Sequence, residues 1–161
     1  MKKLLYQFKY KPFVKDLKDM LTELFIDRLL QHEVFQSLLA TNKYAVFTSV
    51  PLHDRRQKER GYNHAELLAK ALALYFQKPY VSCLVRVKPT ITQVGLAREE
   101  RKENIKNAFI LKENLKSPSE ASTLFIVDDI VTTGATFLEA AKVLKRQGIK
   151  KVYGLALAGE N

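Results

Sequence analysis

The pattern of apolar and polar positions alternates between short continuous runs and helical stripes. The apolar runs are too short for helices and are rich in strand-forming residues; they lie at 44–50, 82–88, 108–111, 124–127 and 152–158. Between them, apolar residues recur at helical spacing in 14–30 and 64–77, and again from Phe137 to Leu144. This alternation predicts an α/β fold in three layers, with a mostly parallel sheet of about five strands. With 161 residues, the chain is expected to form one domain, 1–161.

One stretch joins a predicted strand to a predicted helix. Residues 124–127 form the strand, and Asp128 and Asp129 follow where it emerges at the solvent-facing edge of the sheet. A threonine-rich loop comes next, and Gly148 is a stop signal for the helix that follows. Ligand sites of α/β proteins are built in this way, at the carboxyl ends of strands.

The loop has the residue types that bind a single phosphate group. Its members are Thr132, Thr133, Gly134, Ala135 and Thr136. At a helix N-terminus, unpaired backbone N–H groups and the positive end of the helix dipole attract an anion, and threonine hydroxyls donate hydrogen bonds to phosphate oxygens. No lysine follows the glycine, which excludes the loop that binds nucleoside triphosphates.

The two carboxylates suit another part of the same ligand, because Asp128 and Asp129 would repel a phosphate. Carboxylates accept hydrogen bonds from vicinal sugar hydroxyls, or hold a divalent cation directly or through water. A sugar diol beside a monophosphate describes a ribose 5-phosphate. Two simpler interpretations stay open: an acidic strand end with a helix cap, and the metal-binding acidic pocket of a phosphotransfer domain.

A second candidate anion site follows the strand at 44–50, which ends in Pro51. The next residues, 52–64, read as a basic loop, and Asn63 is a suitable cap for the helix 64–77. The basic residues of this loop are Arg55, Arg56, Lys58 and Arg60. If this strand and the strand at 124–127 are neighbours in one parallel sheet, the loop flanks the first site and favours anion binding there. The simpler interpretation is a solvated basic turn.

Composition narrows the classes of partner. Lys and Arg number 27 against 17 Asp and Glu, and the resulting charge of +10 favours phosphates or nucleic acid. No apolar run approaches a membrane span and the start lacks the features of a signal peptide, so we expect a cytoplasmic protein. The single cysteine, Cys83, excludes an intrachain disulfide and a cysteine-clustered zinc site.

Two further segments have open interpretations. In 4–13, aromatic residues alternate with basic or polar ones, which indicates a strand with an aromatic face, or else a contact with single-stranded nucleic acid. The segment 90–106 is polar and highly charged, and it reads as a loop followed by a solvated helix.

The motifs described above resemble a known family. Residues 124–136 resemble the signature with which type I phosphoribosyltransferases bind phosphoribosyl pyrophosphate (PRPP). Further stretches resemble the ComF family of phosphoribosyltransferase-like proteins: 9–11, 50–52, Arg56, 60–63, Thr92, Gln93, Leu96, Arg98, Arg101, Asn104 and 108–109. Together these stretches span nearly the whole chain.

The resemblance implies a division of the ligand among the motifs. It gives Asp128 and Asp129 the ribose hydroxyls and 132–136 the 5-phosphate. It places the pyrophosphate near Pro51, Leu52, Arg56 and Arg60, and it makes Gln93, Arg98 and Arg101 candidates for a mobile cover over the site. Mg²⁺ is expected to arrive with PRPP rather than on a direct protein ligand.

The resemblance also implies partners and a role. ComF proteins are connected with DNA uptake in naturally competent bacteria, so the expected partners are PRPP, single-stranded DNA and other competence proteins. Two other functions stay open: a metabolic phosphoribosyltransferase that acts on a nucleobase or amine, and a regulatory module that senses PRPP. The residues include no unambiguous general base, so they favour PRPP binding more than turnover.

One departure from the family concerns zinc. ComF proteins usually begin with a cysteine-rich zinc segment, and this sequence has no such segment at its start. We therefore expect either a short family member or a truncated form, with no zinc in this chain.

Overall fold

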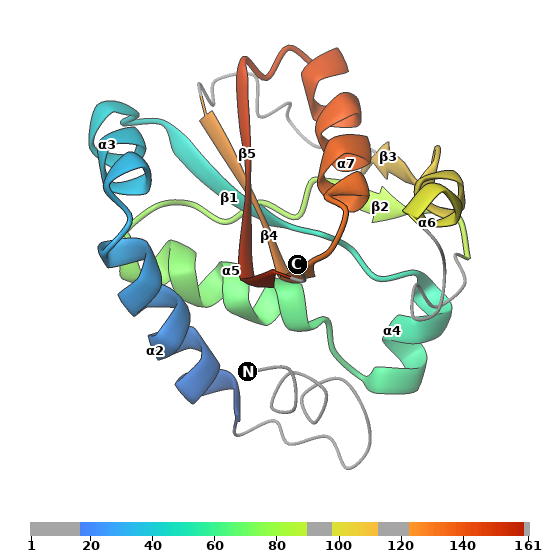
Figure 1. Ribbon diagram of the computed structural model, residues 1–161, viewed down its shortest axis with the longest axis horizontal. Helices are drawn as coiled ribbons and strands as arrows, with labels where there is room; N and C mark the ends of the chain where they lie inside the picture. The colour runs from blue at the N-terminus through green and yellow to red at the C-terminus, as the bar shows by residue number, and fades with distance from the viewer. Residues whose placement is uncertain (1–16, 90–97, 113–122, 160–161) are drawn as a thin grey trace.

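The computed structural model describes residues 17–89, 98–112 and 123–159 (Figure 1). Its helices are α2 (Leu17–Leu30), α3 (Glu33–Thr41), α4 (Asp54–Arg60), α5 (His64–Tyr75), α6 (Arg98–Ile105) and α7 (Ala135–Arg146). Its strands are β1 (Ala45–Ser49), β2 (Leu84–Arg86), β3 (Phe109–Leu111), β4 (Thr123–Val131) and β5 (Lys151–Gly159). The predicted segment 4–13 lies outside the described residues.

The main sheet is parallel and has the order β1-β4-β5. The strands β2 and β3 instead form a separate antiparallel pair. The α/β prediction is therefore confirmed, but the strands do not all join one sheet. Residues 79–81 run beside β1, where the N–H of Phe47 donates to the carbonyl of Pro79 at 2.9 Å and the N–H of Val81 donates to the carbonyl of Phe47 at 2.9 Å. Further along, the Sγ of Cys83 donates to the hydroxyl of Thr48 at 3.2 Å, and Arg86 of β2 forms an isolated parallel bridge with His53.

Helices cover both faces of the sheet. The side chains along β4 show this, since they alternate between two cores. Phe125 and Val127 belong to a core that also contains Leu68 and Leu72 of α5. Their neighbours along the strand belong to a second core with α7; these are Leu124 and Ile126, which lie with Ala140 and Leu144. The three-layer prediction is thereby confirmed (Figure 1).

The strand β4 is longer than its apolar run predicted. It continues through both acidic residues to Val131, because β5 extends equally far and pairs Asp128 with Ala156 and Ile130 with Ala158. Parallel pairing continues wherever a partner strand supplies backbone hydrogen bonds, whatever the side chains are. The acidic pair therefore lies inside the end of the strand rather than beyond it.

The segment 52–64 contains a short helix, α4, where the sequence predicted a loop. The ring of His53 caps its start by accepting a hydrogen bond from the N–H of Arg55 at 3.3 Å. At its end, Gly61 adopts φ +80° and donates its N–H to the carbonyl of Gln57 at 2.8 Å. The helix has no buried residue, so no apolar periodicity marked it in the sequence.

We expect Gly154→Ala to destabilise the fold by about 1–3 kcal/mol, the usual cost of overpacking. A Cβ atom on Gly154 would lie 2.8 Å from Cγ of Phe137, in the first turn of α7. Gly159→Ala is the matched control on the same strand, because its Cβ would meet only Val131 Cγ1, at 3.8 Å. Urea unfolding measures both free energies. Equal stability of the two variants would show that Phe137 moves aside without cost.

Candidate functional site

The strands β1 and β4 are neighbours, and their carboxyl ends lie at the same edge of the sheet. This is the arrangement in which the segment after β1 flanks the candidate site after β4. The N–H of Val50 donates to the carbonyl of Val127 at 2.9 Å, directly beyond the pairing of Ser49 with Val127. The amide of Asn63 donates to the carbonyl of Val50 at 3.0 Å and accepts from the N–H of Ala65 at 3.1 Å. The predicted cap of α5 thus also fastens the end of β1.

The two aspartates differ in their surroundings. Asp128 is half-buried, and its Oδ1 accepts a hydrogen bond from the N–H of Asp129 at 2.8 Å. The Asp129 residue is only 4% exposed. The expectation that both lie at a solvent-facing edge is therefore wrong for Asp129, because the strand continues past it. Since side chains alternate along a strand and Val127 belongs to the α5 core, Asp128 follows on the face that α7 covers.

The loop after β4 leads into α7 on the same face as Asp128. Its glycine, Gly134, is the N-cap of α7 and adopts φ +73°, which glycine tolerates far better than residues with a Cβ. Gly134 has no side chain to cap the first turn, and this turn contains no acidic residue. The hydroxyl of Thr133 accepts a hydrogen bond from the N–H of Ala135 at 3.4 Å. The helix therefore presents N–H groups and the positive end of its dipole beside the acidic pair.

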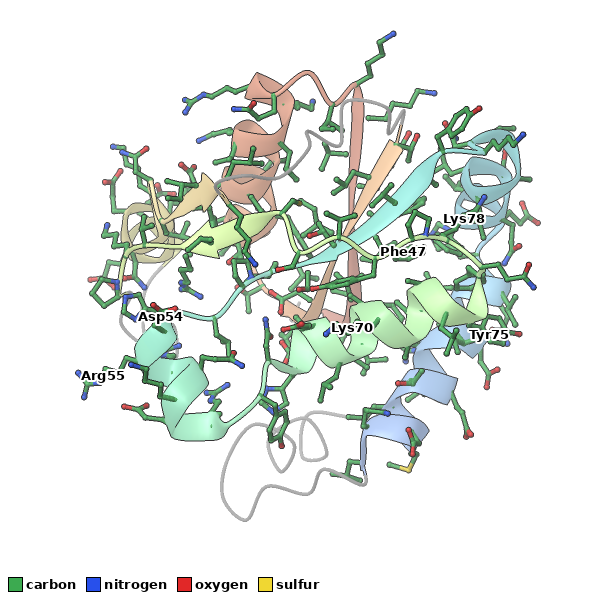
Figure 2. The ribbon with its side chains drawn as sticks, turned by 180° about the vertical axis from the view of Figure 1, so that it is seen from behind. Phe47, Asp54, Arg55, Lys70, Tyr75 and Lys78 are labelled. Atoms are coloured by element: carbon green, nitrogen blue, oxygen red, sulfur yellow. The ribbon has the colours of Figure 1, made fainter. Side chains whose placement is uncertain are left out.

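The helix α4, which follows β1, turns two of its basic side chains toward the protein. Arg56 and Arg60 are one turn apart, so they share a face of this helix, and both are half-buried. Arg55 instead points outward, with 81% of its side chain exposed, and pairs with Glu59 at 3.0 Å (Figure 2). Pro51 and Leu52 are half-buried between β1 and α4. The helix thus directs two of its arginines away from open solvent.

The sequence prediction missed one basic residue, Arg86 at the end of β2. It is 9% exposed and its guanidinium lies 5.7 Å from the ring centroid of Phe109. Burial and repulsion by Arg56 lower the pKa of Arg86 to about 10, while attraction by Asp128 raises it. Arg86 therefore lies within electrostatic range of both Arg56 on α4 and Asp128 at the end of β4. The signal in the sequence was a single arginine within the apolar run 82–88.

The predicted cover is described only in part. Gln93 lies outside the described residues, whereas Arg98 and Arg101 lie on α6, which packs against α7. The turn after α6 is fixed to α7 by Glu139, whose carboxylate accepts from the N–H of Asn107 at 3.0 Å and pairs with Lys142 at 2.8 Å. The contact between Asn107 and Glu139 thus holds α6 beside α7, the helix that follows the threonine-rich loop.

The described residues contain neither a metal-binding cluster nor a membrane-spanning helix. In 17–89, 98–112 and 123–159, no three His, Cys, Asp or Glu residues form a group that could hold a metal ion. In the same ranges, no helix has both the length and the apolar character that a membrane span requires.

Comparison with known proteins places the chain in a family. Residues 58–159 match the phosphoribosyl transferase domain. Competence protein F of Haemophilus influenzae is 42% identical over 68% of this chain and 48% of its own length. The DNA utilization protein YhgH of Salmonella typhimurium is 39% identical over 78% of this chain and 55% of its own. Competence protein ComFC of Bacillus subtilis is 31% identical over 66% of this chain and 41% of its own.

The chain spans about half the length of the curated relatives it matches. Among solved structures, an orotate phosphoribosyltransferase from Aeropyrum pernix gives a TM-score of 0.37 and 17% identity, over 83% of this chain and 76% of that one. The resemblance stated from the motifs is confirmed by the family match and by the named relatives. The chain belongs to the phosphoribosyl transferase domain family, in its ComF branch.

Proposed function

We propose that this chain binds PRPP with Mg²⁺ and acts in the handling of single-stranded DNA during DNA uptake. The observation that supports PRPP most is the meeting of three groups at one edge of the sheet. These are the acidic pair at the end of β4, the open N-terminus of α7, and the basic residues Arg56 and Arg86. A PRPP molecule needs contacts of these three kinds, for its diol, its 5-phosphate and its pyrophosphate.

Each part of PRPP has a matching surface in this proposal. The 5-phosphate lies on the residues 132–136, where N–H groups and threonine hydroxyls donate to it. The ribose hydroxyls donate to the half-buried Asp128, and the buried Asp129 next to it in the strand is the second carboxylate assigned to the ribose. The pyrophosphate lies near Pro51, Leu52, Arg56 and Arg60, and Arg86 is added to this group. An anion in that position would relieve the repulsion between Arg56 and Arg86.

The donor set of this edge suits Mg²⁺. This cation takes oxygen ligands, keeps several of its waters, and is usually held by one or two carboxylates together with substrate phosphates. PRPP would supply the phosphate oxygens that bind Mg²⁺ directly, and the half-buried carboxylate of Asp128 would accept hydrogen bonds from waters that the cation keeps. When bound, Mg²⁺ would neutralise charge on the pyrophosphate as that group departs. Arg56 and Arg86 would hold the same group in place.

The DNA-handling part of the proposal comes from the relatives and the charge. Relatives carry the names competence protein F, ComFC and DNA utilization protein. The charge of +10 favours a polyanionic partner. A metabolic phosphoribosyltransferase would instead release pyrophosphate with one particular nucleobase or amine, which distinguishes the two functions.

Calorimetric titration with PRPP and Mg²⁺ tests the proposal. We expect saturable binding of PRPP, with weaker binding of ribose 5-phosphate because it lacks the pyrophosphate that meets Arg56 and Arg86. Removal of Mg²⁺ with EDTA should weaken PRPP more than ribose 5-phosphate, because the metal acts on the pyrophosphate. No saturable heat with PRPP, in a protein that remains folded by circular dichroism, would contradict the PRPP site.

A further inference from the structure

The edge of the sheet opposite the candidate site gathers a second set of side chains. Parallel pairing aligns Ala45 with Thr123, and Thr123 with Lys151, so the three strands begin side by side. Because neighbouring strands lie about 4.8 Å apart, the starts of β1 and β5 are separated by about 10 Å. The end of α5 joins the same edge, since the Nζ of Lys78 donates to the carbonyl of Lys43 at 3.4 Å.

The segments of the described chain (17–89, 98–112 and 123–159) that meet at this edge are basic, and none of them contains an acidic residue. They are 42–44, 76–79 and 145–151. Their basic residues, together with Tyr44, form what we call the amino-edge surface: Lys43, Lys78, Lys145, Arg146, Lys150 and Lys151. Apart from the half-buried Lys78, these side chains are exposed. By contrast, Lys70 and Lys102 pair with a glutamate on their own helices, at 2.7 and 2.8 Å.

Exposed tyrosines lie among these positive charges. Tyr44 is 63% exposed, and the Nζ of Lys43 lies 6.0 Å from its ring centroid. Tyr75 is 51% exposed at the end of α5, three residues before Lys78, and Figure 2 shows both at the same end of this helix. Rings exposed to this extent among lysines offer stacking faces beside phosphate contacts.

We propose that the amino-edge surface binds single-stranded nucleic acid, with lysines on the phosphates and a base stacked on Tyr44. A single strand is favoured over a duplex because its bases are free to stack on a protein ring. This inference identifies the DNA-contacting surface of the proposed function and rests on that function for its role. The surface is independent of PRPP, because β4, with nine residues, separates the two edges by about 25–30 Å. Both ligands can therefore be bound at once.

The first test removes charge from the surface. We expect K145A/K150A/K151A to weaken binding of a labelled oligothymidylate by at least about tenfold, measured by fluorescence anisotropy. The slope of log affinity against log salt should fall by about 2, since each lost single-strand phosphate contact contributes about 0.7. The control K18A/K70A/K102A removes the same charge from other parts of the surface and should stay within about twofold of the parent. Equal losses in both variants would attribute binding to net charge and overturn the proposal.

The second test concerns the ring. Tyr44→Ala should lose about tenfold in oligothymidylate affinity, the usual effect of losing one stacked base, and Tyr44→Phe should retain it. PRPP titration of each variant should match the parent. If the parent binds the oligonucleotide but not PRPP, the PRPP site is refuted and this surface is not. The proposal is overturned if the parent does not bind the oligonucleotide, prefers duplex DNA, or binds only anionic vesicles. It is also overturned if Tyr44→Ala and the triple lysine variant both bind like the parent.

Discussion

Asp128→Asn is expected to weaken PRPP binding by roughly 10- to 100-fold, because hydrogen bonds to a charged group contribute about 1.5–3 kcal/mol. The carboxylate of Asp128 is half-buried at the end of β4, on the face that leads into the phosphate loop. An amide in its place keeps one acceptor but loses the charge that receives two ribose hydroxyls. Ribose 5-phosphate shares these hydroxyls, so its affinity should fall by a similar factor.

Asparagine is the suitable replacement, because Asp129 is buried inside the strand and alanine would leave a cavity there. The double variant D128N/D129N should lower PRPP affinity further, to the limit of calorimetric detection, with the fold retained. Asp27→Asn on α2 is the control for loss of one negative charge and should bind PRPP like the parent. If Asp128→Asn bound PRPP as tightly as the parent, the ribose would have to lie elsewhere.

The core of the candidate site could be predicted from the sequence because it is local. Strand, acidic pair, loop and helix follow one another within 123–146, so their order along the chain already places them in space. The extent of β4 could not be predicted in this way. It depends on β5, which begins twenty residues after β4 ends, and the pairing of Asp128 with Ala156 overrides the polar character of the acidic residues.

The basic side of the site was harder to predict for a different reason. A helix with no buried face, such as α4, has no apolar periodicity from which it could be predicted. Arg86 carries no motif, and a single arginine in an apolar run usually reads as an exposed strand position. The antiparallel pairing of β2 with β3, together with a parallel bridge between Arg86 and His53, places it over Phe109 and within electrostatic reach of Asp128. Such a contact joins segments about forty residues apart, which no local pattern shows.

The second large effect is expected at Arg86. Arg86→Gln should weaken PRPP binding by roughly 10- to 100-fold, because it removes a charge-assisted contact to the pyrophosphate. Ribose 5-phosphate has no pyrophosphate, so its affinity should change by less than about threefold. Arg86→Lys should fall between the parent and the Gln variant, since an ammonium keeps the charge but lacks the two-pronged geometry of a guanidinium.

Stability distinguishes this role from a purely structural one. In the free protein, burial and Arg56 lower the pKa of Arg86 to about 10, which means that the fold disfavours its charged form. The charge is therefore held at a cost that a bound anion would offset. Urea unfolding should therefore find Arg86→Gln no less stable than the parent. Arg146→Gln, far from this edge, is the charge-matched control and should keep PRPP affinity. Loss of stability in Arg86→Gln with equal losses for both ligands would instead make Arg86 a structural residue.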